Sequence, residues 1–434
     1  MDPRSAATRS AYPTDSGAVN RRRKRYLAIV STAVVPPPLS RLGSPAVVYP
    51  GAFLVAFGEG MLNLGIVFFL RDQLGAGPSL IGWFMAYSVL VYMLGCLLLV
   101  RAFDRLRPQA ALLASLFGMP AFLLLLVLLP ALPLTFLFSG LYRLALAFFW
   151  PPAMGWLSQG VEGEALSRRQ ARFNLSWSTG LVSSYALAGL ASQRNTGLPL
   201  VLCIAVFTGY AAVLAAMLAA SPSLRAAPFR ATRAPAGASA AGAGSPGEGT
   251  PQRYPAWVGM FASYVVSGMV ATVFPLFAQD VLGATRGVVG TLVSSRTLLQ
   301  AAGFLVLGAA SFWHYRGRWL VASQVYLALL LFAMLFARSV GFYAVLLPLL
   351  GLGSAFSYAG GLFHGIAGSS RRAARMAMHE STLNGGYIVG ASASGLLYQQ
   401  FSMRAVVVFC LGSSLAAILT QGLLLSRLRG RGRR

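Results

Sequence analysis

Long apolar segments alternate with short polar ones along most of this chain. A helix that crosses a bilayer needs about 20 predominantly apolar residues, and twelve segments approach or exceed that length. They lie at about 48–70, 79–100, 109–129, 132–156, 173–192, 197–219, 255–278, 286–310, 318–337, 339–363, 378–399 and 404–426. We therefore predict an all-α membrane protein with twelve transmembrane helices.

The two halves of the chain share a repeat. Residues 60–82 read GMLNLGIVFFLRDQLGAGPSLIG, and residues 268–290 read GMVATVFPLFAQDVLGATRGVVG. At a constant offset of 208 the identical pairs are Gly60/Gly268, Met61/Met269, Phe69/Phe277, Asp72/Asp280, Leu74/Leu282, Gly75/Gly283, Ala76/Ala284 and Gly82/Gly290. Two copies in the same membrane orientation are typical of a transporter built from two similar halves.

The repeat divides the chain into two six-helix bundles, which we expect at 46–220 and 255–426. Between them, 221–254 is rich in Ala, Gly, Pro, Ser and Arg, which predicts a flexible cytoplasmic linker. Residues 1–45 predict a disordered cytoplasmic tail, with an Arg-rich transit peptide or a start codon placed too early as alternatives. Residues 427–434 form a basic cytoplasmic tail.

Composition and charge support a membrane protein. Only 10% of the residues are charged, against about 25% in a soluble domain, and the mean hydropathy is +0.67. The net charge of +25 does not indicate a nucleic-acid partner, because of where the charges lie. Of 35 basic residues, 28 fall in the tails and in the loops after the even-numbered segments 2 to 10, and five fall in the opposite loops. This asymmetry places both termini in the cytoplasm, and we expect the bacterial inner (plasma) membrane.

The chain carries no recognisable enzyme motif. Its three cysteines have no metal-binding spacing, and its three histidines form no His-Glu-x-x-His pair. The sequence also has no P-loop and no nucleotide-binding glycine motif. We therefore expect no catalytic residue, metal or cofactor. The expected partners are a small-molecule substrate, protons and the lipid bilayer, and we expect a monomer.

Three ionisable residues stand out inside the apolar segments. Glu59, Arg143 and Arg296 lie near the middle of the first, fourth and eighth segments. Charges deep in a membrane are costly and mark functional sites, and these three share the depth of a central substrate site. Their repeat mates are uncharged, so the charges break the symmetry of the two halves. Two arginines against one acid favour an anionic substrate or a proton-coupled carboxylate.

Each of these charges has a polar or aromatic companion on the same helix face, four or seven residues further on. The companions are Asn63, Gln300 and Trp150. The alternative to a binding role is a structural ion pair between Glu59 and Arg143 that fixes helix packing.

Segment 378–399 opens with a further polar face. Glu380, Asn384 and Tyr387 follow a spacing of four and then three residues and share one side of the helix. Glu380 is either a cytoplasmic latch with the arginines of the preceding loop or a solvated charge at the helix end. Trp177 lies near the matching end of segment 173–192, with the same ambiguity. We expect these residues to line the substrate cavity: Asn63, Arg143, Trp150, Arg296, Gln300, Asn384 and Tyr387.

Small residues recur every four positions in two matched segments. They are Ser176, Gly180, Ser184 and Ala188 in one, and Thr382, Gly386, Gly390 and Ser394 in the other. Small residues at this spacing let helix backbones approach closely in lipid. They predict either static packing or a sliding contact between the halves.

Together these features resemble the major facilitator superfamily of secondary transporters, over about 48–426. The loop between helices 2 and 3 of that family reads Gly-x-x-x-Asp-Arg-x-Gly-Arg-Lys/Arg. Here VRAFDRLRPQ carries Asp104 and Arg105 at the matching positions, although both glycines of the motif are replaced. Arg143 matches an arginine that the family carries within helix 4.

The resemblance implies two pseudo-symmetric six-helix bundles around a central cavity, with segments 3, 6, 9 and 12 facing lipid. It further implies alternating access, in which the halves rock about the substrate. We expect transport of a small solute, coupled to protons through Glu59, with a cytoplasmic gate at Asp104, Arg105 and Glu380. A sensor or assembly factor on the same scaffold, without transport activity, is the alternative.

Overall fold

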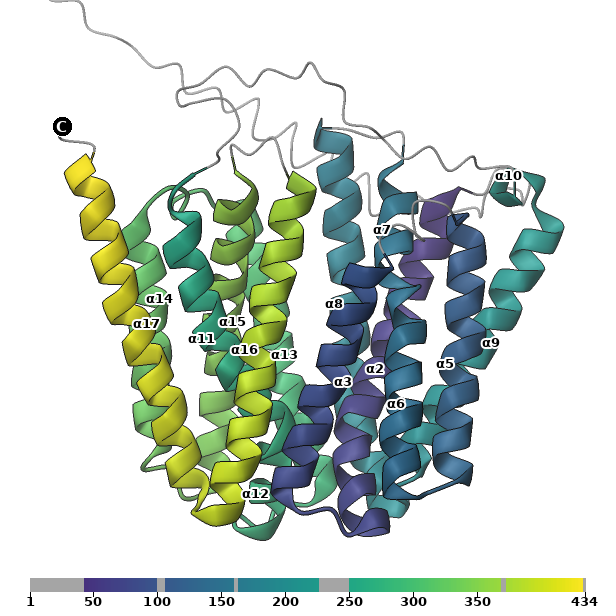
Figure 1. Ribbon diagram of the computed structural model, residues 1–434, viewed down its shortest axis with the longest axis horizontal. Helices are drawn as coiled ribbons and strands as arrows, with labels where there is room; N and C mark the ends of the chain where they lie inside the picture. The colour runs from purple at the N-terminus through teal and green to yellow at the C-terminus, as the bar shows by residue number, and fades with distance from the viewer. Residues whose placement is uncertain (1–42, 100–105, 160–162, 226–249, 368–371, 432–434) are drawn as a thin grey trace, which may run out of the picture.

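The computed structural model describes residues 43–99, 106–159, 163–225, 250–367 and 372–431 (Figure 1). These residues form helices joined by short connections, with no β-strand among them. The helices are α2 Ser44–Leu74, α3 Pro78–Leu98, α5 Pro108–Leu128, α6 Leu132–Ala147, α7 Trp150–Ser158, α8 Gly163–Arg194, α9 Leu198–Ala220, α10 Pro222–Arg225, α11 Arg253–Thr272, α12 Phe274–Asp280, α13 Arg286–Ala309, α14 Gly317–Met334, α15 Val340–Ile366, α16 Arg372–Gln400 and α17 Met403–Arg431.

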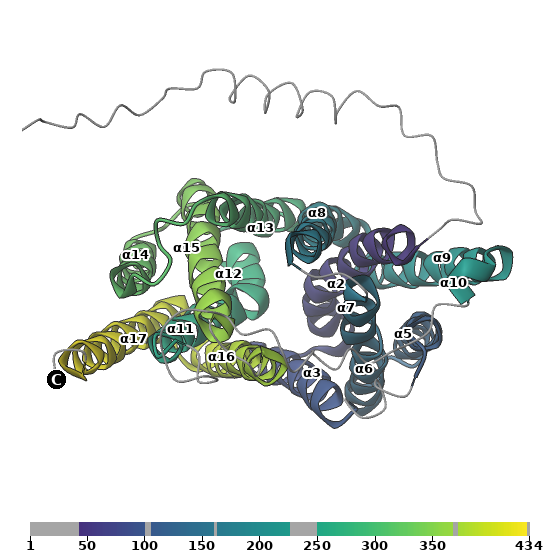
Figure 2. The ribbon, with the colours of Figure 1, turned by 90° about the horizontal axis from the view of Figure 1, so that it is seen from above.

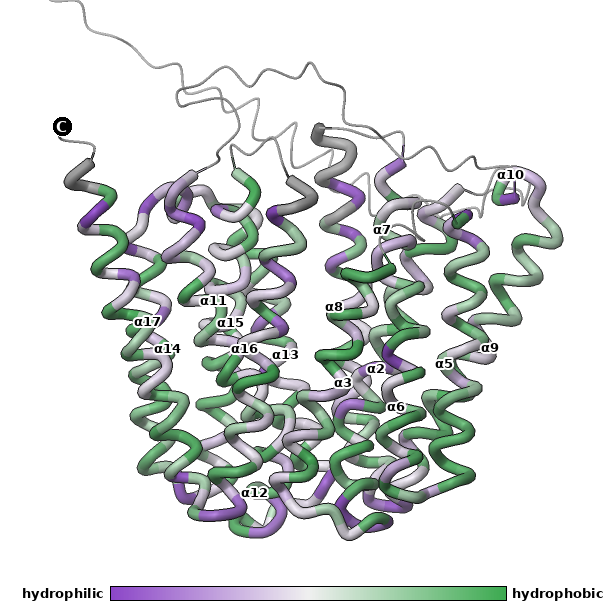
Figure 3. Tube along the Cα trace, in the orientation of Figure 1, coloured by the Kyte–Doolittle hydropathy of each residue, from purple (hydrophilic) through white to green (hydrophobic). Residues whose placement is uncertain are grey.

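The twelve predicted membrane segments are confirmed. Within the described part of the chain, ten helices are long and apolar enough to cross a membrane, with α6 and α7 taken together as one. The other two segments are α8 and α16, with 32 and 29 residues. Both lie among the other helices in Figure 1. Figure 3 shows hydrophobic residues along the helices and hydrophilic ones gathered towards the two faces.

Proline explains why two of the twelve spans are broken into two helices. The span of α6 and α7 is interrupted at Phe148 and Phe149, and that of α11 and α12 at Val273. Pro152 and Pro275 follow these breaks. A proline lacks the backbone N–H and clashes with the carbonyl four residues before it, which interrupts a helix at this position.

The helices form two bundles, α2 to α9 and α11 to α17, on either side of the molecular centre (Figure 2). Helices α5, α9, α14 and α17 lie at the periphery. These are the third, sixth, ninth and twelfth spans, which the family resemblance placed on the outside. The beginning of α2 and the end of α17 lie at the same face of the molecule (Figure 1), as an even number of spans requires.

The predicted tail and linker lie mostly outside the described residues. Where they are described, helix α2 already begins at Ser44, with Pro45 in its first turn. Proline suits this position because the first turn leaves N–H groups unpaired in any case. The short helix α10 and the start of α11 at Arg253 also fall within the range predicted as linker.

Each bundle has its own apolar core, and the two cores interdigitate. The first core includes Leu112 and Phe207 and takes in Leu276 from α12 of the other bundle. The second includes Leu347 and takes in Met61 from α2. Burial therefore holds the two halves together as well as each half by itself.

The glycines of the four-residue stripes pack within their own halves. A Cβ on Gly180 of α8 would lie 2.3 Å from the carbonyl oxygen of Phe53 on α2. A Cβ on Gly390 of α16 would lie 2.1 Å from the carbonyl oxygen of Val265 on α11. The stripes thus join α8 to α2 and α16 to α11. These glycines pack inside their own halves, as the static-packing alternative expects.

Candidate functional site

Glu59 and Arg143 form an ion pair inside the first bundle. Arg143 Nη1 on α6 lies 2.8 Å from Glu59 Oε1 on α2, and the two side chains are only 10% and 15% exposed. Arg143 Nη2 donates to Asn63 Oδ1 at 2.9 Å, and the indole Nε1 of Trp150 donates to Glu59 Oε2 at 3.2 Å. Four of the predicted site residues therefore belong to one hydrogen-bonded cluster.

Local helix geometry explains this cluster. Glu59 and Asn63 are one helical turn apart on α2, so both side chains reach α6 from the same face. Trp150 is the first residue of α7, after the break in the fourth span. The break redirects the chain, and the indole then reaches the second oxygen of the Glu59 carboxylate.

Arg296 lies in a different environment in the second bundle. Its Nη2 donates to Ser267 Oγ at 2.8 Å and to Ser354 Oγ at 3.3 Å, while its buried Nε has no hydrogen-bond partner. Ser267 occupies the repeat position of Glu59, at the offset of 208. The second bundle thus has a hydroxyl where the first has a carboxylate, and Arg296 has no ion-pair partner among the described residues.

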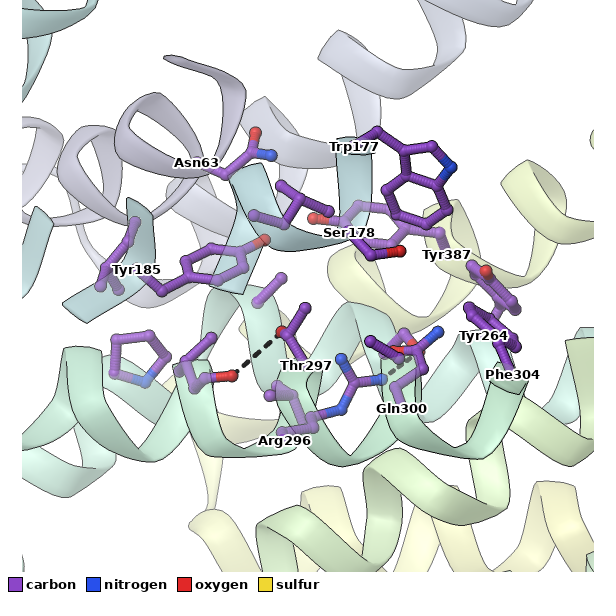
Figure 4. Close-up of a pocket in the computed structure, with 18 residues that line it drawn as sticks. Asn63, Trp177, Ser178, Tyr185, Tyr264, Arg296, Thr297, Gln300, Phe304 and Tyr387 are labelled. Atoms are coloured by element: carbon purple, nitrogen blue, oxygen red, sulfur yellow. Dashed lines mark hydrogen bonds between the residues drawn. The ribbon is translucent and has the colours of Figure 1, made fainter. Parts of the chain in front are cut away.

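A cavity of about 200 Å³ lies between the two bundles. Figure 4 shows its polar and aromatic lining, with Asn63 on one side and Arg296 and Gln300 on the other. The lining residues are Asn63, Leu64, Trp177, Ser178, Leu181, Tyr185, Tyr264, Ser267, Val270, Ala271, Pro275, Val293, Arg296, Thr297, Gln300, Ala301, Phe304 and Tyr387. They come from α2, α8, α11, α12, α13 and α16, so both halves contribute.

The cavity includes four of the seven residues expected to line it: Asn63, Arg296, Gln300 and Tyr387. Arg143 and Trp150 contact Glu59 and Asn63 but do not line it. Asn384 is buried on α16, one turn before Tyr387, and is also absent from the lining.

Of the three residues expected to form the cytoplasmic gate, only one lies in the part of the chain that the structure describes. Glu380 is exposed on α16. Asp104 and Arg105 lie outside the described residues. The cytoplasmic gate at these three residues therefore stays a prediction.

Sequence reasoning missed most of the aromatic wall of the cavity. Tyr185, Tyr264 and Phe304 line it together with Tyr387 and Trp177. An aromatic residue in an apolar segment gives no local sign of whether it faces lipid, a neighbouring helix or a cavity. The available signal was helical spacing, since Phe304 lies four residues after Gln300 and shares its face.

Two ion pairs join the halves at one face of the molecule. We call it the hairpin face, where α2 meets α3 and α12 meets α13, at the bottom of Figure 1. Arg71 on α2 lies 2.6 Å from Asp280 on α12, and Arg286 on α13 lies 2.5 Å from Asp72 on α2. The two acids are equivalent positions of the repeat. Each half thus supplies one acid and one arginine to the other.

Close backbone contacts accompany these ion pairs. A Cβ on Gly82 of α3 would lie 3.1 Å from Gly395 Cα on α16, and one on Gly189 of α8 would lie 2.9 Å from Gly290 Cα on α13. The two contacts are related by the repeat, and both bring opposite halves together. The halves therefore meet closely on the side of the cavity that faces the hairpins.

The fold and the cavity define a membrane protein of the transporter type. A family model described as Major Facilitator Superfamily matches residues 48–246 and 256–433. The chain therefore belongs to the major facilitator superfamily, and its two matched stretches correspond to the two halves.

Solved structures of transporters have the same fold. A bacterial homolog of the human lysosomal transporter Spinster, in an inward-facing and occupied conformation, has a TM-score of 0.70 at 11% identity, over 87% of this chain and 96% of that one. The nucleoside transporter NupG has a TM-score of 0.66 at 13% identity, over 88% and 99%. A comparison with curated protein sequences gives no match. These identities support a shared fold and do not identify the solute.

Proposed function

We propose that this protein is a secondary active transporter that carries a small solute across the membrane by alternating access. One observation carries the proposal: a cavity lined by both halves, with cross-half ion pairs on one side of it. Breaking those pairs and closing the other side would expose the same cavity to the opposite face. A solute held between two rocking bundles would be carried across in this way.

Orientation follows from the charge distribution. The hairpin connections lie opposite the C-terminal end of α17 (Figure 1), and the positive-inside rule supports a cytoplasmic location for that end. We propose that the hairpin face is the outer face of a bacterial inner membrane. The arrangement described here then faces the cytoplasm, and Asp104, Arg105 and Glu380 belong to a gate that closes in the opposite state.

Proton coupling is assigned to Glu59. Protonation would remove the charge that holds Arg143, and Arg143 is also hydrogen-bonded to Asn63. Asn63 lines the cavity. A proton on Glu59 would therefore change the hydrogen bonding of a residue that faces the solute, which is the link that coupled transport needs.

Flux into proteoliposomes tests the proposal. The purified chain is reconstituted, an inside-acid or inside-alkaline gradient is imposed, and a panel of radiolabelled organic acids, amines, sugars and nucleosides is offered. We expect one class to accumulate above equilibrium with a gradient of one sign, and an uncoupler to abolish the accumulation. Binding of a solute without flux under either gradient would instead favour a sensor or an assembly factor.

A further inference from the structure

We propose that the cavity binds a small monocarboxylate that carries an aromatic ring, with Arg296 as the carboxylate anchor. This inference rests on the proposed function, because it names the class of solute that the transporter would carry. It depends on which charges in the protein are already neutralised, on the shape of the cavity wall and on its size.

Arg296 is a half-buried cation without an ion-pair partner among the described residues. The structure describes four carboxylate side chains, and three of them, Glu59, Asp72 and Asp280, are in ion pairs with other arginines. The fourth, Glu380, is exposed on α16 and forms no ion pair with Arg296. Two serine hydroxyls solvate one end of the guanidinium, and Nε has no partner. A cation held away from water is costly unless an anion pairs with it, and the planar donors of arginine match a carboxylate.

The number of available charges limits the ligand to one negative charge. Arg143 lies in the same region, but the Glu59 carboxylate neutralises it and Asn63 occupies its second Nη. A ligand that enters the cavity therefore meets one free positive charge, that of Arg296. A dianion would leave its second charge unpaired in a low-dielectric site, and a cation would be repelled.

The aromatic side chains in the cavity wall favour a ligand that carries an aromatic ring. Trp177 and Tyr185 approach from the first bundle, and Tyr264, Phe304 and Tyr387 from the second (Figure 4). Aromatic side chains bind planar groups by stacked or edge-to-face contacts. Because the aromatic residues come from both halves, a ring placed between them would contact both bundles at once.

The size and polarity of the cavity limit the size of the ligand and the substituents on its ring. A volume of about 200 Å³ is below the roughly 300–1,000 Å³ typical of drug-sized ligands. It suits a single ring with a short acidic side chain. Gln300 and Thr297 lie on α13 within one turn of Arg296 and line the same wall. Their amide and hydroxyl would bind a ring substituent such as a hydroxyl group.

Isothermal titration calorimetry on the purified full chain tests this ligand class. The probes are benzoate, 4-hydroxybenzoate, nicotinate and 3-phenylpropanoate, each compared with its neutral amide, and cyclohexanecarboxylate as the non-aromatic acid. We expect at least one aromatic acid to bind at least about tenfold more tightly than its amide, since hydrogen bonds between charged groups are the strong ones. We expect the same acid to bind more tightly than cyclohexanecarboxylate.

Variants assign the preference to Arg296. Arg296→Gln should bring the acid down to the affinity of its amide while leaving amide binding unchanged. Arg296→Lys, which keeps the charge but loses the planar donors, should be intermediate and covers the case in which the glutamine variant does not fold. Arg338→Gln, the same substitution at an exposed position between α14 and α15, should change nothing.

The outcomes separate this inference from the proposed function. Failure of every aromatic acid to bind, or an acid preference that survives Arg296→Gln, overturns the ligand class. Accumulation of a neutral or cationic solute in proteoliposomes overturns it too, and leaves transport intact. Acids that bind through Arg296 but never accumulate support the ligand class and overturn transport.

Discussion

Arg143 and Arg296 lie at similar depth but differ in charge compensation, because each contacts a different residue at the same position of the repeat. Arg143 faces Glu59, and Arg296 faces Ser267, which occupies the equivalent position of the repeat. The first arginine is neutralised within the protein, and the second is left with hydroxyl partners. This difference leads to two predictions.

The first concerns Glu59. Glu59→Gln imitates the protonated carboxyl, so the protein should fold, bind solute and lose proton-driven accumulation. Flux in proteoliposomes with and without a gradient measures the loss, and size-exclusion chromatography confirms folding.

A purely structural ion pair would behave differently. Each single variant, Glu59→Gln and Arg143→Gln, would then leave a buried charge unpaired, at a cost of about 3–5 kcal/mol. Both would express poorly, and the double variant would recover with its transport intact. That pattern would exclude proton coupling through Glu59.

The second prediction concerns Arg296. Removal of a half-buried cation that has no acidic partner among the described residues relieves an uncompensated charge, so Arg296→Gln should leave the melting temperature unchanged or raise it in the absence of ligand. Arg143→Gln should lower it under the same conditions. Differential scanning fluorimetry in detergent compares the two. A large drop for Arg296→Gln would show that its serine hydrogen bonds already stabilise the fold.

At the scale of helices, the hairpin face depends on backbone contact. A Cβ on Gly189 would lie 2.3 Å from the carbonyl oxygen of Arg286, closer than real Cβ contacts come. Gly189→Ala should therefore separate α8 from α13 and favour the state in which the hairpin face is open. Gly209→Ala on α9, where nothing lies within 4 Å of the added Cβ, is the matched control.

Accessibility of a cysteine introduced at Ser294 on α13 measures the shift. A membrane-impermeant maleimide added from the hairpin side should label it faster in the Gly189→Ala background than in the control. Equal rates in the two backgrounds would mean that α8 and α13 adjust locally without opening this face.

The helices could be predicted from the sequence better than their contacts. Twelve apolar runs were visible because lipid requires apolar surface over about 20 residues, and Glu59, Arg143 and Arg296 stood out against that background. Which arginine pairs with Glu59 depends on how α2 packs against α6, and hydropathy carries no information on helix neighbours. The same is true of Tyr185 and Tyr264, whose place in the cavity wall is set by tertiary packing.

At the scale of the whole molecule, orientation relative to the membrane is a prediction from charge. A reporter fused after Arg434 and one inserted near Gly237 should both be cytoplasmic, because 28 basic residues fall in the tails and loops predicted on that side and five in the opposite loops. Fusions of alkaline phosphatase, which is active only outside the cytoplasm, and of green fluorescent protein read this out. Phosphatase activity at either position would invert the assignment of the hairpin face.

We expect the unpaired charge of Arg296 to make the unloaded protein sensitive to voltage. A cavity open to the cytoplasm takes the cytoplasmic potential, and a negative interior favours a positive charge there by up to about 2.3 kcal/mol per 100 mV. A bound monoanion cancels that charge. We therefore expect the resting potential to return the unloaded protein to its inward-facing state while hardly affecting the loaded one. Capacitive currents from reconstituted protein after voltage steps should be large without ligand, shrink as ligand saturates, and vanish in Arg296→Gln.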